Sequence, residues 1–452
     1  MPIAAPTADE LARLQDEAVR FTRELIRIDT TNFGGNDPAT WGKGETEAAE
    51  QVVEWLREVG LEPEVIESAP GRPSVLVTMP GEDRERGGLI LHGHLDVVPA
   101  RAEDWSVDPF AAEIIDGMIY GRGAVDMKDM VGMILAVARH LARTGQTPPR
   151  DLMFAFFADE ENASVWGAQW LVENRPELFD GMTEAISEVG GYSITLPEEA
   201  TGEDVRAYLV QTAEKGLAWG RLRATGRAGH GSVPNDENAI VRLARAITAI
   251  DEHEFPIECI ASVRALFDGI TEITGTGWDE SDIDRFLPLT GGARQFVAGT
   301  LRDSANLTML ESGYKVNVIP QTAEAGFDCR FLPGHQEEVL GLLDELAGEH
   351  VEVVVDHIGV SVDSPRESAL MDAMTAAVQA EDPGSKVLPY CLSAGTDNKP
   401  LSSLGIAGYG FAPLQLPADL DFAPLFHGVD ERVPVDAVRF GARVLLRLVA
   451  TC

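Results

Sequence analysis

The feature that most restricts the fold of this chain is a continuous apolar segment, residues 152–158, which ends directly in Asp159, Glu160 and Glu161. A strand that is apolar at every position is typical of a parallel sheet covered by helices on both faces. Adjacent carboxylates at the end of such a strand repel each other, and their burial is costly unless a cation compensates the charge. The segment therefore predicts a helix-covered sheet with a bound cation at its edge.

Strand and helix patterns alternate through the first half of the chain. Thr7 and Glu10 have the spacing of a capping box, and the apolar residues behind them recur at helical intervals, which predicts an opening amphipathic helix. A second helix is predicted over 45–59, before Gly60. Further strands are predicted over 74–79, 89–97, 152–158 and 184–189, and further helices over 127–144 and 163–174. This order predicts an α/β fold, a mostly parallel mixed sheet with helices on both faces, whose ligands bind beyond the carboxyl ends of the strands.

The pattern changes near Thr212 and changes back near Asp363. Between these points we expect strands over 216–224, 323–332 and 351–358, helices over 238–250 and 336–346, and an acidic, poorly patterned stretch over 251–292. A strand over 405–411 and a closing helix over 435–450 then return to the first pattern. We therefore expect a main domain in two parts, 1–212 and 364–452. An inserted α+β domain, 213–363, would join it at two crossings, and a domain joined in this way can close as a hinge.

Composition excludes several classes of protein. The 452 residues are too many for one hydrophobic core. With 74 acidic and 36 basic residues, the net charge of −38 disfavours binding to nucleic acids and to anionic membrane surfaces. Four cysteines without CxxC spacing argue against a disulfide framework and thiolate zinc sites, and with no signal-peptide pattern at the N-terminus they favour the cytoplasm. No apolar run is long enough to predict a transmembrane helix.

His92, His94 and Asp96 alternate along the predicted strand 89–97 and therefore share one face. A histidine followed two residues later by a carboxylate suits a zinc site, because the carboxylate orients the imidazole whose other nitrogen binds the metal. The same residues are equally typical of a polar strand end. His92 fits no ligand position and is better explained as a structural histidine.

Local pattern alone leaves three further residues open. Asp126, between a glycine-rich turn and a helix start, could cap that helix or bind a metal. Glu188 lies at the end of the strand predicted over 184–189, and His427 lies just before the last helix. Glu160 and Glu161 are more informative. In an extended backbone successive side chains point to opposite sides, so one could bind a metal while the other acts on a water molecule at that metal. Together these side chains suffice for two zinc ions and a general base.

Eight motifs run in order along nearly the whole chain: HLDVVP, GRGAVDMKD, ADEE, SEVGG, GHGSVP, NVIPQTAEAGFDCR, AGTD and HGVDER. Together they resemble the di-zinc amidohydrolases that include carboxypeptidase G, acetylornithine deacetylase, succinyl-diaminopimelate desuccinylase, aminoacylase and carnosinase. The inserted domain 213–363 resembles the lid and dimerisation domain of these enzymes, and the two flanking parts resemble their catalytic domain. The long lid and the stretch 105–121 are most similar to the branch of carboxypeptidase S and the N-acyl amino acid hydrolases.

The resemblance implies two Zn²⁺ ions per subunit, which Co²⁺ or Mn²⁺ could replace. Asp126 would bridge both ions, with His94 and Glu188 completing one site and Glu161 and His427 the other. Glu160 would be the general base for a zinc-bridging hydroxide, and Asp96 would orient His94. A cis peptide bond after Asp126 is also implied.

The resemblance also implies roles for residues of the lid and of the substrate pocket. Arg330 lies on the polar face of a predicted strand, where its guanidinium could bind a substrate carboxylate or form a surface ion pair with a nearby acid. The resemblance favours the carboxylate, with Asn317, Gly395 and Thr396 as partners in substrate binding. His230 resembles the lid histidine that stabilises a tetrahedral oxyanion, often from the other subunit, which implies a homodimer through the lid.

The chain is therefore expected to be a zinc-dependent amidohydrolase that acts on a small molecule, an N-acyl amino acid or a dipeptide with a free carboxylate. A narrow biosynthetic deacetylase or desuccinylase, of the acetylornithine or succinyl-diaminopimelate type, is one alternative. A catalytically silent metal-binding protein that captures peptides is another, against which the intact Glu160 argues. Asp129, Ala394 and residues 162–164 depart from the commonest form of the motifs, which leaves the acyl group and the side-chain preference open.

Overall fold

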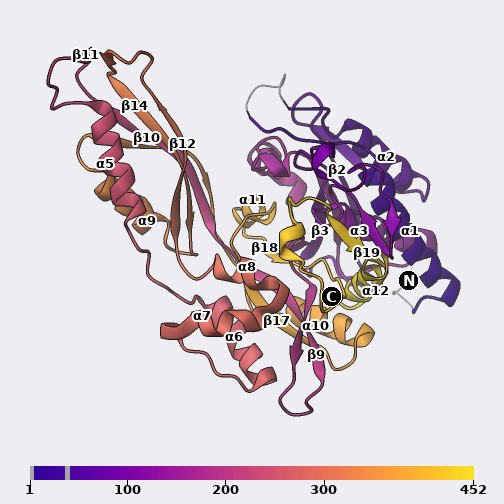
Figure 1. The fold of residues 1–452 in the computed structure, drawn as a ribbon. Helices are drawn as coiled ribbons and strands as arrows, with labels where there is room; N and C mark the ends of the chain where they lie inside the picture. The colour runs from indigo at the N-terminus through magenta and orange to yellow at the C-terminus, as the bar shows by residue number, and fades with distance from the viewer. Residues whose placement is uncertain (1–4, 36–40) are drawn as a thin grey trace.

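The computed structural model describes residues 5–35 and 41–452. Its centre is a ten-stranded mixed sheet in which four neighbouring strands run parallel (Figure 1). These strands are β6 (Leu152–Phe157), β3 (Gly88–His94), β7 (Met182–Ser187) and β18 (Ala407–Gly410). The others are β1 (Glu64–Glu67), β2 (Pro73–Met79), β8 (Tyr192–Pro197), β9 (Asp204–Glu214), β16 (Val362–Asp363) and β17 (Lys386–Leu392). This sheet confirms the expected α/β fold.

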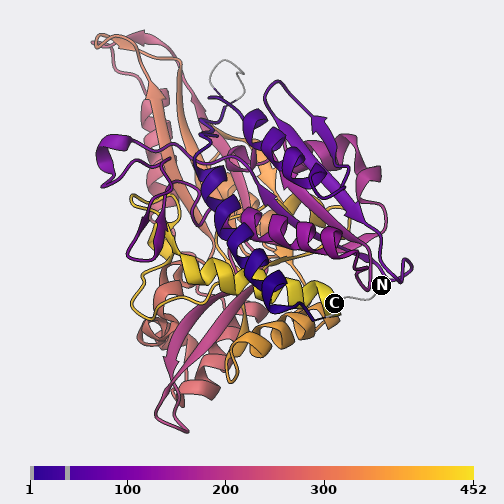
Figure 2. The same cartoon turned by 90° about the vertical axis from the view of Figure 1, so that its right-hand side faces the viewer.

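Helices cover both faces of the sheet. The side chains of its buried strands point alternately to the two faces, and on each face they pack with helices in a separate apolar core. Phe154 and Phe156 pack into a core that includes α1 (Ala8–Ile26), α3 (Lys128–Thr144) and α12 (Val435–Thr451), which lie side by side (Figure 2). Phe157 faces the opposite side, toward α4 (Ala168–Asn174) and α11 (Asn398–Ser402). The helix α2 (Thr46–Arg57) also lies on the first face. The predicted capping box of Thr7 and Glu10 is present at the start of α1.

Several boundaries differ from the predicted ones. The helix predicted over 163–174 begins only at Ala168, because a 3₁₀ turn, Glu160–Asn162, and two residues with positive φ, Ala163 and Ser164, precede it. The strand predicted over 89–97 ends at His94. The predictions above also omit β8, β9, β17 and the helix α10 (Ala369–Glu381).

A second sheet forms an elongated lobe, which we call the lid (residues 216–251 and 304–359). Its antiparallel strands, in spatial order, are β12 (Ser304–Ser312), β14 (Thr322–Phe331), β10 (Gly216–Thr225) and β15 (Val351–Gly359). The helices α5 (Ala239–Asp251) and α9 (Gln336–Ala347) cover one face around a separate apolar core. The short pair β11 (Gly229–His230) and β13 (Val318–Ile319) lies at the far end of the lid (Figure 1).

The acidic stretch 251–292 contradicts the expectation of a poorly patterned region. It contains α6 (Ala261–Thr274) and α7 (Ile283–Phe286) and leads into α8 (Arg294–Ala298). The apolar side chains of these helices, Leu266 and Phe267 among them, pack into the first core and not into the core of the lid. They recur at helical spacing, although acidic residues surround them. The chain therefore passes between the two lobes four times, at 215, 252–260, 299–303 and 360–361, and not twice as expected.

All four cysteines are buried and carry free thiols. Among the described residues, no helix combines the length and the apolar character that crossing a lipid bilayer requires.

Candidate metal centre

Imidazole and carboxylate side chains, which are of the kinds that bind metals, meet at the carboxyl ends of three neighbouring parallel strands. His94 ends β3, the turn with Glu160 and Glu161 follows β6, and Glu188 follows β7. Asp126 reaches the same place from the segment before α3, and its peptide bond to Met127 is cis, as expected. His427 comes from the loop before α12, with a φ of 57°.

Asp126 lies between the two histidines. Its Oδ1 is 3.1 Å from His94 Nε2, and its Oδ2 is 3.1 Å from His427 Nε2. Glu188 Oε1 lies 3.7 Å from His94 Nε2, and Glu161 Oε2 lies 3.1 Å from His427 Nε2. The structure therefore brings the five predicted ligands together, with Asp126 between the two histidines.

The electrostatics of this cluster favour a bound cation. Burial raises the pKa values of Glu160, Glu161 and Glu188, and neighbouring carboxylates raise them further. Burial acts on Asp126 in the same direction, but its hydrogen bonds with His427 and His94 outweigh it and hold its pKa well below the usual range. The Oε1 of Glu161 is buried without a hydrogen-bond partner. The ligand atoms of His94, Asp126 and Glu161 lie within 4.8 Å of one another, as do those of His94, Glu160 and Glu188. Imidazoles and carboxylates gathered in this way suit divalent transition-metal ions such as zinc.

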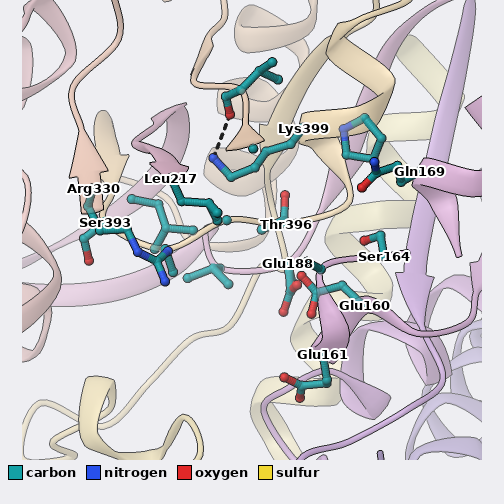
Figure 3. A pocket seen from close by; sticks show the side chains of 18 of the residues that line it. Glu160, Glu161, Ser164, Gln169, Glu188, Leu217, Arg330, Ser393, Thr396 and Lys399 are labelled. Atoms are coloured by element: carbon teal, nitrogen blue, oxygen red, sulfur yellow. Dashed lines mark hydrogen bonds between the residues drawn. The ribbon is translucent and has the colours of Figure 1, made fainter. Parts of the chain in front are cut away.

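Glu160 and Glu161 diverge for a different reason from the expected one. They lie in a 3₁₀ turn and not in extended backbone, because Asp159 takes a φ of 60° after the end of β6. Successive side chains of such a turn are about a third of a turn apart. Glu161 consequently approaches His427, whereas Glu160 lies beside Glu188 (Figure 3).

Asp96 connects the end of β3 to this turn. Its backbone oxygen accepts a hydrogen bond from His94 Nδ1 at 3.0 Å, which leaves Nε2 free to face the other ligands. The carboxylate of Asp96 accepts hydrogen bonds from the backbone N–H groups of Glu160 and Glu161, each at 3.1 Å. Asp96 therefore orients the histidine mainly through its carbonyl and the acidic turn through its carboxylate.

A buried hydrogen-bond network that the sequence did not predict lies behind Asp96. Asn32 Nδ2 donates to Asp96 at 2.8 Å and to Asp159 at 2.9 Å. Arg72 donates to Asn32 Oδ1 at 3.0 Å and pairs with the buried Glu45. Local pattern gives no signal for Asn32, because its two carboxylate partners lie 64 and 127 residues away.

A second buried ion pair holds Asp126 and the loop of His427 in place. Glu431 accepts hydrogen bonds from the backbone N–H groups of Val125 at 2.7 Å and Asp126 at 3.2 Å, and it pairs with Arg122 at 2.6 Å. Arg122 also donates to the carbonyl oxygen of His427 at 3.3 Å. This pair therefore joins the segment of Asp126 to the loop of His427. Both residues stand in motifs quoted above, but 309 residues separate them.

A cavity of about 730 Å³ opens beside the metal cluster, and residues of both lobes line it (Figure 3). Arg330 lines it from β14, with Leu217 and Trp219 of the neighbouring strand β10. Its guanidinium forms two hydrogen bonds with Asp328, at 2.6 and 2.9 Å. The predicted carboxylate-binding residue thus lines the cavity and already carries an acidic partner on its own strand.

Gly395 and Thr396 line the same cavity. The backbone N–H and the hydroxyl of Thr396 donate to the buried carboxylate of Glu214, at 3.1 and 2.7 Å. Gly395 lies against the side chain of Lys399, whose Cε would be 2.1 Å from an added Cβ.

His230 and Asn317 do not line the cavity. They lie together at the far end of the lid, where Gly231 donates to the carbonyl oxygen of Asn317 at 2.9 Å (Figure 1). His230 is exposed, and its Nδ1 is 2.8 Å from the hydroxyl of Ser232. Within one chain these two residues are therefore not brought to the metal cluster.

His92 has a different environment from His94. Its Nε2 is 2.9 Å from the side-chain oxygen of Asn398, and complete burial lowers its pKa to about 4. A neutral, buried and hydrogen-bonded imidazole agrees with the structural role expected for it.

Known proteins resemble this chain in sequence. The family model described as peptidase family M20/M25/M40 matches residues 90–451. Aminoacylase-1 of Sus scrofa is 30% identical over 388 residues, which cover 84% of this chain and 83% of that protein. The N-fatty-acyl-amino acid synthase/hydrolase PM20D1 of Xenopus tropicalis is 28% identical over 454 residues, covering 96% of this chain and 85% of that protein.

Solved structures share the fold. The M20 family metallo-carboxypeptidase Sso-CP2 from Sulfolobus solfataricus has a TM-score of 0.71 at 17% identity, covering 96% of this chain and 99% of that chain. Human carnosine dipeptidase 1 has a TM-score of 0.68 at 15% identity, covering 100% of this chain and 99% of that chain.

Proposed function

This chain belongs to peptidase family M20/M25/M40 and is a hydrolase of amide or peptide bonds, and we propose that it cleaves N-acyl amino acids or dipeptides with a free carboxylate. The observation that carries the proposal is the position of Arg330, which lines the same cavity as the metal cluster from the other lobe. A guanidinium binds a carboxylate through two parallel hydrogen bonds. A substrate held there would present its amide bond to the cluster.

The cluster fits two zinc ions, which Co²⁺ or Mn²⁺ could replace. Asp126 would contact both ions, His94 and Glu188 one of them, and Glu161 and His427 the other. Two such ions would lower the pKa of a water molecule and polarise the amide carbonyl.

Glu160 is the proposed general base. Its Oε2 is 3.9 Å from His94 Nε2, farther than the nearest oxygens of Asp126 and Glu188. Glu160 would take the proton of the attacking water and deliver it to the departing amine, while Asp96 holds the turn that carries it.

A direct test combines metal analysis with a panel of substrates. The purified chain should contain two zinc equivalents and hydrolyse some N-acyl amino acids or dipeptides. Activity confined to acetylornithine or succinyl-diaminopimelate would favour the narrow biosynthetic alternative. Bound metal without hydrolysis of any compound would favour the silent peptide-capture alternative.

The role of Arg330 predicts a selective loss of substrate affinity. Arg330→Ala should raise the KM for substrates with a free carboxylate by about 10- to 100-fold, which corresponds to a charge-assisted interaction of about 1.5–3 kcal/mol. The KM for the matching amides should change little. Steady-state kinetics on paired acids and amides measures the difference. Equal losses on both would show that Arg330 acts through Asp328 as a structural residue.

We further propose a homodimer formed through the lid. The strand β12 is an edge of the lid sheet, and Met309 and Leu310 on it are 74% and 72% exposed. Tyr314 and Val316 in the following turn are also exposed. An exposed apolar edge strand is a ready site for pairing with another chain. The exposed end of the lid that carries His230 could then reach the partner's cavity, where the imidazole would stabilise the oxyanion.

Mixing two inactive variants tests this arrangement. Subunit exchange between Glu160→Gln and His230→Ala chains should restore part of the activity. One site of the mixed dimer would then combine an intact Glu160 with the intact His230 of the partner chain. The measurement is turnover after exchange, with the exchange itself followed by a mass tag. Absence of restored activity in an exchanged dimer would exclude the trans arrangement, and a monomer at the assay concentration would exclude the dimer.

A further inference from the structure

Two buried lysines lie where the lid joins the catalytic part. Lys399 belongs to α11, which packs on the central sheet, and its side chain is 8% exposed. Lys215 is the single residue between β9 of the central sheet and β10 of the lid, and it is 1% exposed. Burial of an ammonium group is costly unless its donors are satisfied. The hydrogen-bond partners of these two side chains therefore decide how costly their burial is.

Lys399 joins two of the four crossings between the lobes. Its ammonium group donates to the carbonyl oxygen of Lys215, at the first crossing, and to that of Val360 at 2.9 Å, at the last crossing. The carboxylate of Glu214 lies 3.6 Å away and supplies the opposite charge. Two of the three donors of the ammonium group are thus used by backbone carbonyls, and the carboxylate balances its charge.

Lys215 reaches the third crossing. Its ammonium group donates to the carbonyl oxygens of Gly299 at 3.1 Å and Arg302 at 2.7 Å, in the segment that leads from α8 into β12. Burial lowers the pKa of both lysines, to about 8 for Lys215. Two ammonium groups thus connect three of the four crossings through backbone carbonyls.

The position of Arg330 depends on these crossings. In the lid sheet Arg330 is paired with Leu217 of β10 and with Ser304 of β12. Leu217 follows the first crossing by two residues, and Ser304 follows Arg302 of the third crossing by two residues. A change in the path of either crossing would therefore move Arg330 relative to the metal cluster.

We propose that Lys399 and Lys215 are positioning residues, which hold three crossings as one unit and thereby fix the distance between Arg330 and the metal cluster. The lid strands that leave these crossings then do not separate from one another, and the lid keeps its orientation to the catalytic part. Lys399 lines the cavity as well, but its ammonium group is directed to two backbone carbonyls and to Glu214, which distinguishes it from a residue that binds the substrate directly. The effect of Lys399 on catalysis rests on the proposed function of Arg330. Its effect on how the crossings hold the two lobes together does not.

Distance measurements between the lobes test the proposal without substrate. Spin labels on cysteines introduced at the exposed Glu85 of the catalytic part and Glu345 of α9 report the separation of the lobes, with labelled chains diluted in unlabelled ones. Lys399→Met should broaden the distance distribution, because a thioether cannot donate to two carbonyls. Lys399→Arg should keep it narrow. An unchanged distribution in folded Lys399→Met would overturn the proposal.

Kinetics separates positioning from general stability. Lys399→Met should raise the KM for carboxylate substrates by about 10- to 100-fold, with a smaller change in kcat and unchanged metal content. In an Arg330→Ala background the same substitution should raise KM little further, because both act through one contact. Additive losses would overturn the link to Arg330 even if the distance distribution broadens. If Lys399→Met does not fold, Lys399→Gln gives the same comparison with a shorter polar side chain.

Lys128 offers a matched control within the catalytic part. It is fully buried and donates to two backbone carbonyls, those of Leu25 at 3.0 Å and Ile28 at 2.9 Å. Lys128→Met should lower the free energy of unfolding while the distance between the lobes stays narrowly distributed. Equal broadening in both variants would show that the loss of any buried lysine loosens the molecule, and it would overturn the specific role of Lys399.

Discussion

Replacing Glu160 by Gln is expected to lower turnover by about 10²- to 10⁴-fold while metal content stays at the level of the unchanged protein. Glu160 lies at the cavity next to the metal cluster, but its nearest contact to a ligand nitrogen is 3.9 Å. Gln preserves the size of the side chain and cannot accept a proton. Single-turnover kinetics and metal analysis on the same preparation measure both quantities. Near-unchanged turnover in Glu160→Gln would remove Glu160 as the base.

The adjacent Glu161 is the matched control for this variant. Its Oε2 is 3.1 Å from His427 Nε2, and its other oxygen has no hydrogen-bond partner, which suits a ligand. Glu161→Gln should weaken binding of one metal equivalent, and excess metal should restore part of the activity. Excess metal should not restore Glu160→Gln. If metal rescues both variants equally, the two residues do not have distinct roles.

Replacing Asp126 by Asn should remove activity by about 10³-fold or more and reduce the metal content at both sites. Its two oxygens each lie 3.1 Å from a different histidine, so one substitution affects both groups of ligands. Loss of metal-based stabilisation of the transition state costs several kcal/mol, and each 1.36 kcal/mol is about a tenfold change in rate. Titration with zinc, followed by calorimetry and by activity, measures both effects. Two tightly bound equivalents in Asp126→Asn would contradict a bridging role.

Asp129 provides the control for a buried carboxylate near this site. It lies in the first turn of α3, its carboxylate oxygens have no side-chain partner, and burial raises its pKa to about 8. At pH 7 this group is therefore mostly protonated, and Asn resembles the neutral form. Asp129→Asn should keep its metals and most of its activity, which separates the loss of a ligand from the loss of a buried acid.

The positions of His94, Glu160 and Glu161 could be predicted from the sequence because they follow local elements, whereas Asp126, Glu188 and His427 were assigned through the resemblance of the motifs. The apolar run 152–158 and the alternation at His94 and Asp96 place side chains at strand ends, and parallel strands bring these ends to one edge. The same reasoning gave the wrong geometry for Glu160 and Glu161, because a residue with positive φ ends the strand before them. The helix α6 was not predicted, because acidic residues obscured the helical spacing of the apolar residues that pack on the first core.

By itself the sequence determined the α/β fold class, and it supplied the carboxylates and imidazoles that stand at the ends of its strands. Apolar periodicity and cap residues act over a few positions, so their signals are local. Only the tertiary structure decided that Arg122 pairs with Glu431 across 309 residues, that His230 lies away from the cluster, and that Lys399 joins the crossings of the lid. These contacts join segments that are distant in the sequence, and their approach depends on the packing of the whole chain.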